Sequence, residues 1–241
     1  MIWLFLEGLA HAEEAAPGFT MQEIWEHSGF IARSVILILV LMLAGTFFVF
    51  IERWIAFHKA RKQSMDLASA IVPHLQGGDI GPALAMCEAE DFKVAYLGGL
   101  LRAGLRELMH RKDDVGLHNA KRAVDKAHME EIAKMKKGMT ILATTGSTAP
   151  FVGLFGTTFG VINAFQGMAS AGSGLASISA GISEALITTG VGTGVAVVGV
   201  WAFNYFNFRT DKVRDELATS EADFIDWAEK LLQEPNAAAG K

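Results

Sequence analysis

Apolar residues fall in long blocks separated by strongly charged segments. Residues 34–51 are 18 consecutive positions without a charge, dominated by Val, Ile, Leu and Phe. A second run of 46 uncharged residues fills the interval between Lys137 and Glu184, and a small polar stretch at 168–174 interrupts it. Because about 20 apolar residues suffice for a helix to cross the hydrocarbon of a bilayer, the pattern predicts three transmembrane helices. They are placed at residues 30–52, 139–167 and 182–208, with a periplasmic turn at 168–181.

The charged segments carry helical periodicity of an amphipathic kind. Apolar residues recur at three- and four-residue steps from Val124 to Met139, with lysine and glutamate on the remaining face. This spacing is typical of a half-buried helix, so we expect the second span to continue outside the membrane as one long helix. The same pattern follows the third span, from Val213 to Leu231.

Residues 64–112 are predicted to form shorter helices, separated at 76–79 and flanked by Pro73 and Pro82 as helix breakers. The predicted fold is therefore all-α: an integral membrane protein with three transmembrane helices, two of them extended into a cytoplasmic bundle. The domains outside the membrane are an amino-terminal segment, a helical domain and a carboxyl-terminal helix with its tail, at residues 1–29, 53–138 and 209–241.

The amino-acid composition agrees with membrane insertion and argues against several kinds of functional site. The chain is 51% hydrophobic with a mean hydropathy of +0.30, which is high for a soluble domain. Its single cysteine, Cys87, offers no disulfide framework and no paired metal ligand. The sequence has no basic arm, no metal-ligand spacing and no nucleophile–base pair, so we expect no nucleic-acid partner, no metal or cofactor, and no enzymatic activity.

Lysine and arginine are distributed very unevenly. Residues 52–137 hold 15 of the 21, residues 209–241 hold 5, and the first 29 residues hold none but have five Glu. Since basic residues are retained on the cytoplasmic side, we expect the amino terminus outside and the carboxyl terminus inside. The basic residues nearest the predicted inner boundaries are Arg53, Lys59, Arg61, Lys62 and Arg209. They are either topology anchors alone or also contacts for anionic lipid.

The amino terminus permits two interpretations. Residues 2–10 are apolar and Ala10-His11-Ala12 is similar to a signal-peptidase site, although a basic segment before it is missing. The alternative is a short interfacial helix that places Trp3 and Trp25 near headgroup depth.

Small and hydroxyl-bearing residues form stripes on the second and third spans. On the second, the stripe is Gly153, Gly156, Thr157 and Gly160; on the third, it is Ala185, Thr189, Gly192, Thr193, Ala196 and Gly199. In a membrane such residues mark contacts between helices. Packing alone accounts for the glycines, but Thr157 and Thr189 fall at similar depth in antiparallel spans, so their hydroxyls could face one cavity.

Two further residues in these spans are chemically unusual. Glu184 is the only acidic residue between Lys137 and Arg209, and a carboxylate at a membrane boundary is a candidate functional group; the alternative places it just outside, in solvent. Pro150 removes a backbone donor inside the second span, which predicts a kink there or a break near Gly146.

Two motifs carry a family resemblance. Ala149-Pro-x-Val-Gly-Leu-Phe-Gly-Thr157 and Gly181-Ile-Ser-Glu-Ala-Leu-Ile-Thr-Thr189 resemble the proton-channel family of ExbB, TolQ and MotA, and ExbB and TolQ more closely. The resemblance implies a pentamer in the bacterial inner membrane, whose second and third spans surround two single-span subunits of the ExbD or TolR kind. For the site, the resemblance implies that Thr157 and Thr189 face an aspartate of that partner and that Glu184 lines the pore. For the function, it implies that protons are the coupling ion and that a TonB- or TolA-like protein receives the force.

The residues themselves leave other functions open. No carboxylate lies deep in a span, which favours a motor subunit that needs a partner's aspartate over a self-sufficient channel or transporter. A membrane scaffold, in which the small residues serve packing only, is a third interpretation. A flagellar-type stator is less favoured because it would have four spans. The glycine-rich segment 190–194 and the polar end of the third span, 204–207, depart from the ExbB and TolQ pattern and leave the powered process undecided.

Overall fold

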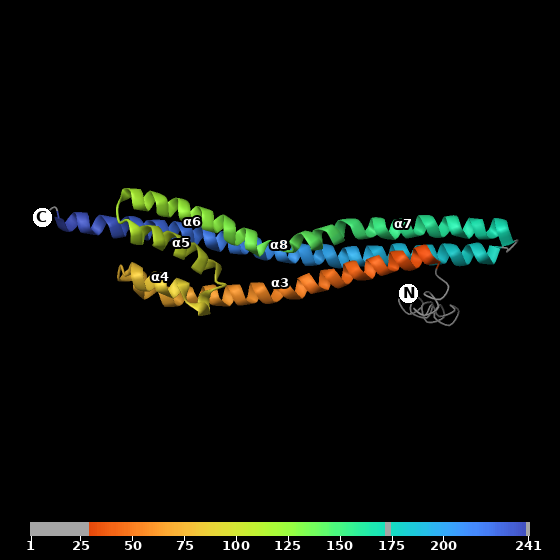
Figure 1. Ribbon diagram of the computed structural model, residues 1–241, viewed down its shortest axis with the longest axis horizontal. Helices are drawn as coiled ribbons and strands as arrows, with labels where there is room; N and C mark the ends of the chain where they lie inside the picture. Colours follow the sequence, from red (N-terminus) through yellow and green to blue (C-terminus); the bar gives the residue numbers. More distant parts are fainter. Residues whose placement is uncertain (1–28, 172–174, 240–241) are drawn as a thin grey trace, which may run out of the picture. The chain divides into compact units, whose positions relative to one another are not determined.

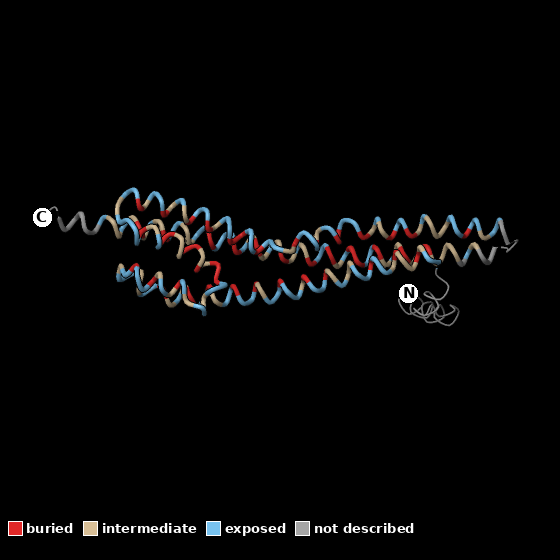
Figure 2. Tube along the Cα trace, in the orientation of Figure 1, coloured by how far each residue is buried: buried red, intermediate tan, exposed pale blue. Residues whose placement is uncertain are grey.

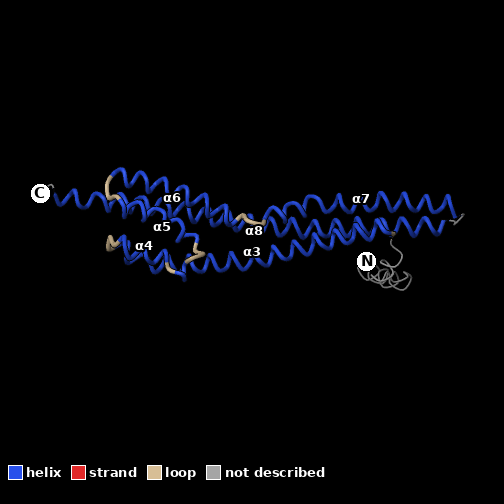
Figure 3. Tube along the Cα trace, in the orientation of Figure 1, coloured by secondary structure: helices blue, strands red, loops and turns tan. Residues whose placement is uncertain are grey.

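The computed structural model of the chain describes residues 29–171 and 175–239. Within these residues every regular element is a helix (Figures 1 and 3), which confirms the all-α prediction. The helices are α3 (Phe30–Gln76), α4 (Ile80–Glu88), a short 3-10 turn η1 (Glu90–Phe92), α5 (Tyr96–His110), α6 (Asp114–Met135), α7 (Met139–Ala171) and α8 (Leu175–Ala239).

Three of these helices contain stretches long and apolar enough to cross a membrane. The stretches lie in Phe30–Gln76, Met139–Ala169 and Gly181–Gln233, which confirms the prediction of three spans. Most residues in their apolar windows are not buried in the single chain, and large exposed examples are Phe48, Phe151 and Trp201, at 73%, 70% and 75% exposure. Such surfaces are expected where a helix faces lipid or another chain rather than water.

The predicted continuous helix from the amphipathic segment into the second span is wrong. The chain turns at residues 136–138 between α6 and α7, and Gly138 has a φ of +79°. A left-handed glycine commonly ends a helix, because it lacks the Cβ that would clash in this conformation. In contrast, α7 is uninterrupted across Gly146 and Pro150. The predicted break near Gly146 therefore lies instead at Gly138.

The first long helix also extends further than predicted. α3 continues from the first span through Pro73 and ends at Gln76, where Gly78 takes a φ of +71°. The separation at 76–79 is confirmed, but Pro73 does not break the helix. Pro82 lies in the first turn of α4, where its missing N–H removes no intrahelical bond.

The structure leaves some predicted boundaries untested. Residues 1–28, and with them the choice between a cleaved and an interfacial amino terminus, lie outside the described residues. α7 extends to Ala171 and α8 begins at Leu175, so both helices run into the segment predicted as a turn at 168–181. Residues 172–174 of that segment are outside the described residues.

The chain divides into two compact units. One, the span unit, contains residues up to 44 together with residues 145–198; the other, the bundle unit, contains residues 45–144 and those from 199 onward. In the bundle unit α5 packs on α4 and on α6, and Figure 2 shows buried positions along these helices. The core at these positions contains many large apolar side chains. Fully buried members of this core are Leu67, Leu100, Leu105, Leu108, Val124, Phe206 and Leu217.

The apolar cluster of the span unit consists of smaller residues. Its buried members are Val35, Leu39, Ala149, Val195 and Ala196, and they come from α3, α7 and α8. One face of the first span is thus buried against the other two, whereas Leu37, Ile38 and Leu41 on its remaining surface are exposed. Glycine, alanine and threonine of α7 and α8 are in close contact, and this contact forms the candidate site.

Candidate functional site in the seam between α7 and α8

Glycines bring the backbones of α7 and α8 into direct contact. A Cβ atom built on Gly153 would lie 2.7 Å from the carbonyl oxygen of Thr188, and one on Gly192 would lie 2.7 Å from that of Ala149. Further along the seam, a Cβ on Gly160 would approach that of Ala185 to 2.8 Å. Any side chain at these positions would force the helices apart. At these glycines the predicted stripe is therefore a helix–helix contact within one chain, whereas its member Thr193 is exposed and bonds to Thr189 O on its own helix.

The close approach joins the two threonine hydroxyls predicted to share a site. Oγ1 of Thr157 and Oγ1 of Thr189 are in hydrogen-bond contact, and either can be the donor. Thr157 Oγ1 also lies 3.1 Å from the carbonyl oxygen of Ala185 and 3.3 Å from that of Gly153. Thr189 Oγ1 lies 3.3 Å from the same Gly153 oxygen. Both side chains are half-buried, so a polar pair sits in an otherwise apolar seam.

A third threonine, which the sequence analysis did not single out, belongs to this arrangement. Thr188 is fully buried and donates to the carbonyl oxygen of Ala185 at 2.7 Å, with Gly153 O at 3.3 Å. It fills the space left by Gly156, where a Cβ would lie 2.6 Å from its hydroxyl oxygen. The tandem Thr188-Thr189 was the sequence signal for this residue. Two consecutive hydroxyls are unusual in an apolar span, and here both reach atoms of α7.

Glu184 contacts the beginning of the first span. The backbone N–H of Gly29 donates to Glu184 Oε1 at 3.0 Å, and the Gly29 carbonyl accepts the first intrahelical bond of α3, from Arg33. A carboxylate is stabilised near a helix N-terminus by the unsatisfied N–H groups and the helix dipole. The side chain is only partly buried. In the single chain Glu184 therefore joins α8 to α3, a contact between residues 155 positions apart that the sequence did not predict.

The remaining glycines and the proline occupy different environments. Pro150 lies within α7, and Gly199 is buried but belongs to the bundle unit. Gly190 and Gly194, in the segment noted as unusually glycine-rich, have no neighbouring atom within 4 Å of a built Cβ. These two glycines are therefore not needed for packing within the chain.

The predicted inner-boundary cations occupy three kinds of environment. Arg53 is 8% exposed, is paired with Glu52 and donates from Nη1 to the carbonyl oxygen of Lys134 at 3.3 Å, so it is unavailable to lipid. Arg61, Lys62 and Arg209 line a common cavity in the bundle unit. Lys59 is exposed outside that cavity.

Within residues 29–171 and 175–239 no group of three or more His, Cys, Asp or Glu side chains could hold a metal ion. What the seam offers is hydrogen bonding: three hydroxyls and their carbonyl acceptors between two membrane-length helices. Such a fold and site define a class, that of helical membrane proteins with a polar helix seam inside apolar spans.

Comparison with known proteins identifies the family. Residues 94–219, half of the chain, match the MotA/TolQ/ExbB proton channel family, and the chain belongs to this family. The match begins in the segment before α5 and ends in α8, so it includes both threonine-bearing helices.

Curated relatives give the same result. The Tol-Pal system protein TolQ of Pseudomonas aeruginosa is 35% identical over 132 residues, which is 52% of this chain and 57% of that protein. The biopolymer transport protein ExbB of Xanthomonas campestris is 38% identical over 125 residues, 52% of this chain and 47% of the relative. The chain thus spans about half the length of the curated relatives it matches.

Proposed function

We propose that this chain is the ring-forming subunit of a proton-driven motor in the bacterial inner membrane, working with single-span partners of the ExbD or TolR kind. Protons are the coupling ion of this proposal, because the chain belongs to a proton channel family. The observation that carries it is the paired hydroxyls of Thr157 and Thr189 in a seam that has no carboxylate of its own beside them.

The hydroxyl pair suits the recognition of a partner's carboxyl group. A hydroxyl can donate to an ionised carboxylate and accept from a protonated one, so the pair can stabilise both states of an aspartate that loads and releases a proton. The chain's own acid in this region, Glu184, is five residues from Thr189 along α8, about 7.5 Å of helix rise, and holds the start of α3. An aspartate from another helix therefore completes the proton pathway, with Glu184 placed near its outer end.

Surface features of the span unit support assembly with other chains. Gly190 and Gly194 are one helical turn apart, and the space that a side chain would occupy beside each is open within the chain, although glycine costs helix stability. Leu186 and Val197 are 60% and 46% exposed on the same helix. Small residues at a four-residue spacing admit a neighbouring transmembrane helix. A homo-oligomer, which family resemblance makes a pentamer around two partner helices, would cover this surface.

The orientation proposed for the chain follows the lysine and arginine asymmetry. The amino terminus and the connection between α7 and α8 lie on the periplasmic side, and residues 53–138 and those from 209 onward lie in the cytoplasm. The relatives named for the Tol-Pal system and for biopolymer transport lead us to propose that a TonB- or TolA-like protein receives the force.

The decisive experiment removes the hydroxyl pair while keeping its shape. Thr157→Val together with Thr189→Val should lower partner-dependent proton flux in liposomes by about tenfold or more, since one lost hydrogen bond of about 1.4 kcal/mol to the transferring group corresponds to a factor of ten. The matched control is Thr158→Val together with Thr193→Val on the same two helices. Both control side chains are exposed and bond only to their own helix, at Leu154 O and Thr189 O.

Equal flux in the two double variants would show that the proposed pathway is wrong. Flux that is as large without any partner as with it would instead indicate a self-sufficient channel. Glu184→Gln, which keeps an acceptor for Gly29, tests the charge at that position separately from its contact with α3.

A further inference from the structure

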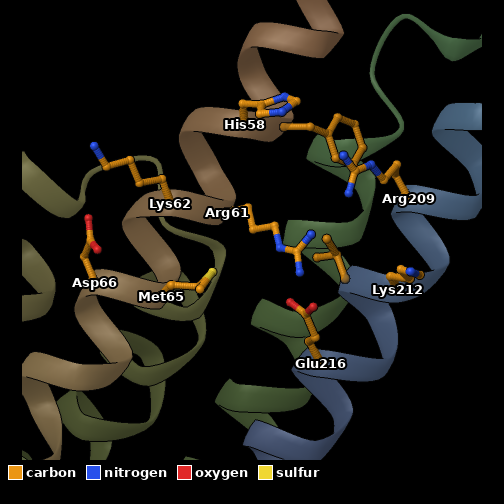
Figure 4. Close-up of a pocket in the computed structure, with 10 residues that line it drawn as sticks. His58, Arg61, Lys62, Met65, Asp66, Arg209, Lys212 and Glu216 are labelled. Carbon is orange, nitrogen blue, oxygen red and sulfur yellow. The ribbon is translucent and has the colours of Figure 1, made fainter.

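A basic cavity lies between α3 and α8 within the bundle unit (Figure 4). Its volume is about 270 Å³. Four permanent cations line it: Arg61 and Lys62 from α3, and Arg209 and Lys212 from α8. Figure 4 shows the side chain of Arg61 extending from α3 into the space between the two helices. The cations come from segments about 150 residues apart, so the fold creates a concentration of charge that neither segment has alone.

The acidic residues of the cavity do not neutralise it. Only Asp66 and Glu216 line it against the four cations. One oxygen of Glu216 already accepts from the hydroxyl of Tyr96, and the pKa of that buried phenol is raised by burial first and by Glu216 second, so Tyr96 remains a donor. Among the described residues no ion pair joins Arg61, Lys62 or Lys212 to a carboxylate; the ion pairs present involve other cations.

The cavity lies just beyond an aromatic belt. Trp54 of α3 stacks on Tyr205 of α8 with ring centroids 5.5 Å apart, and Tyr205 accepts a hydrogen bond from Arg209 Nε at 3.2 Å. Trp and Tyr favour the interface between hydrocarbon and headgroups. Arg209 follows Tyr205 by four residues and Arg61 follows Trp54 by seven, which is about 6 and 10 Å of helix rise. Each headgroup layer is about 5 to 8 Å thick, so Arg209 lies within this layer and Arg61, just beyond it, can reach it with its long side chain.

We propose that this cavity binds the phosphate-bearing headgroup of an anionic glycerophospholipid. Arg61 and Arg209 have the planar donor geometry that phosphate oxygens accept, and the ammonium groups of Lys62 and Lys212 add charge. Phe57, Met65 and Val213 supply an apolar wall for the glycerol and the first acyl carbons, which a free phosphate does not need. This proposal depends on the proposed function in one respect, which is that the proposed orientation places the site at the cytoplasmic leaflet.

The test compares two double variants of the purified full chain that lose the same charge from the same helices. Arg61→Gln with Lys212→Gln removes two cavity cations; Lys59→Gln with Arg214→Gln removes two that do not line the cavity. Retention of phosphatidylglycerol and of phosphatidylcholine is measured by native mass spectrometry. We expect wild type and control to prefer phosphatidylglycerol, and the cavity variant to bind it about 30-fold more weakly, at about 1 kcal/mol for each cation near an anionic headgroup.

A second variant keeps the test informative if the first misfolds. Asp66→Asn removes a cavity acid and should strengthen phosphatidylglycerol binding. Equal binding by wild type and both double variants, or no preference over phosphatidylcholine, would overturn the site. Displacement of the lipid by millimolar inorganic phosphate would overturn the assignment to lipid in favour of a soluble phosphate compound. The variant with Thr157→Val and Thr189→Val should bind lipid normally, so the motor and the lipid site can fail independently.

Discussion

The span unit and the bundle unit bury different kinds of residue. In the bundle unit the core contains Phe224 and a series of leucines, whereas α7 and α8 in the span unit meet through glycine, alanine and threonine. Burying large apolar side chains is favourable when the alternative is water, but lipid is as apolar as leucine. The difference indicates that the bundle is held by side-chain burial, and the span unit by close backbone approach and hydrogen bonds.

The largest effect is expected from a truncation in the bundle core. Phe224 is 3% exposed and lies against Gly104, so Phe224→Ala should lower the free energy of unfolding by about 3 to 5 kcal/mol through lost burial and a residual cavity. Denaturant unfolding in detergent, followed by circular dichroism, measures it. Met129→Ala, at a side chain that is 65% exposed, is the control; a similar loss there would remove the argument for a side-chain core.

The complementary test adds one methyl group to the span unit. Gly192→Ala places a Cβ against the Ala149 carbonyl oxygen and the Gly153 backbone, and we expect a loss of about 1 to 3 kcal/mol from overpacking. Gly194→Ala, on the same helix, meets no atom of the chain and should raise the stability of the single chain by up to about 1 kcal/mol, because alanine favours the helix more than glycine does. The two variants are compared by thermal unfolding in detergent. If both were neutral, the seam would not depend on backbone contact.

A smaller effect is expected from an ion pair on the surface of the bundle unit. Lys121 Nζ lies 2.7 Å from Glu229 Oε1, and both side chains are about 40% exposed. A double-mutant cycle with Lys121→Met and Glu229→Gln should give a coupling of about 0.2 to 1 kcal/mol, which decreases at high salt. A coupling well above this range, or one insensitive to salt, would mean that charge pairing rivals side-chain burial in this unit.

The smallest perturbation uses the chain's single cysteine as a probe. Cys87 is 1% exposed in the bundle core, and burial raises the pKa of its thiol to about 11. Since the thiolate is the reactive form, maleimide labelling of the folded chain should be slow at pH 7.5 and should accelerate steadily as the pH rises through 9. The denatured chain serves as the control and should react fast. A labelling rate that levelled off near pH 9 would indicate an open core.

Sequence patterns predicted the features that depend on nearby residues. Uninterrupted apolar runs predicted three spans. The helical spacing of the small residues predicted that Thr157 and Thr189 share a site, and their hydroxyls are in contact. The turn at Gly138 was missed because the apolar spacing from Val124 to Met139 continues across it, and periodicity does not reveal a left-handed backbone. The prediction that Pro73 breaks a helix is wrong, because a helix can continue past a proline when its neighbours hold it in place.

Contacts between distant segments could not be predicted in this way. Arg53 has the charge and position of an interfacial anchor, yet it is buried and donates a hydrogen bond to the carbonyl oxygen of Lys134, 81 residues away. The link from Glu184 to Gly29 likewise depends on where α3 begins relative to α8. The basic cavity needs both α3 and α8 in place before its charges are close. Each depends on tertiary packing, which local spacing does not encode.

The hydroxyl pair in the seam has two ways of arranging its hydrogens. In one, Thr157 donates to Thr189, which donates to the carbonyl oxygen of Gly153; in the other, Thr189 donates to Thr157, which donates to that of Ala185. Both arrangements leave every hydrogen with an acceptor, and they differ only by rotation of two O–H bonds. The seam therefore contains a small dipole that can reverse direction while the helices stay in place.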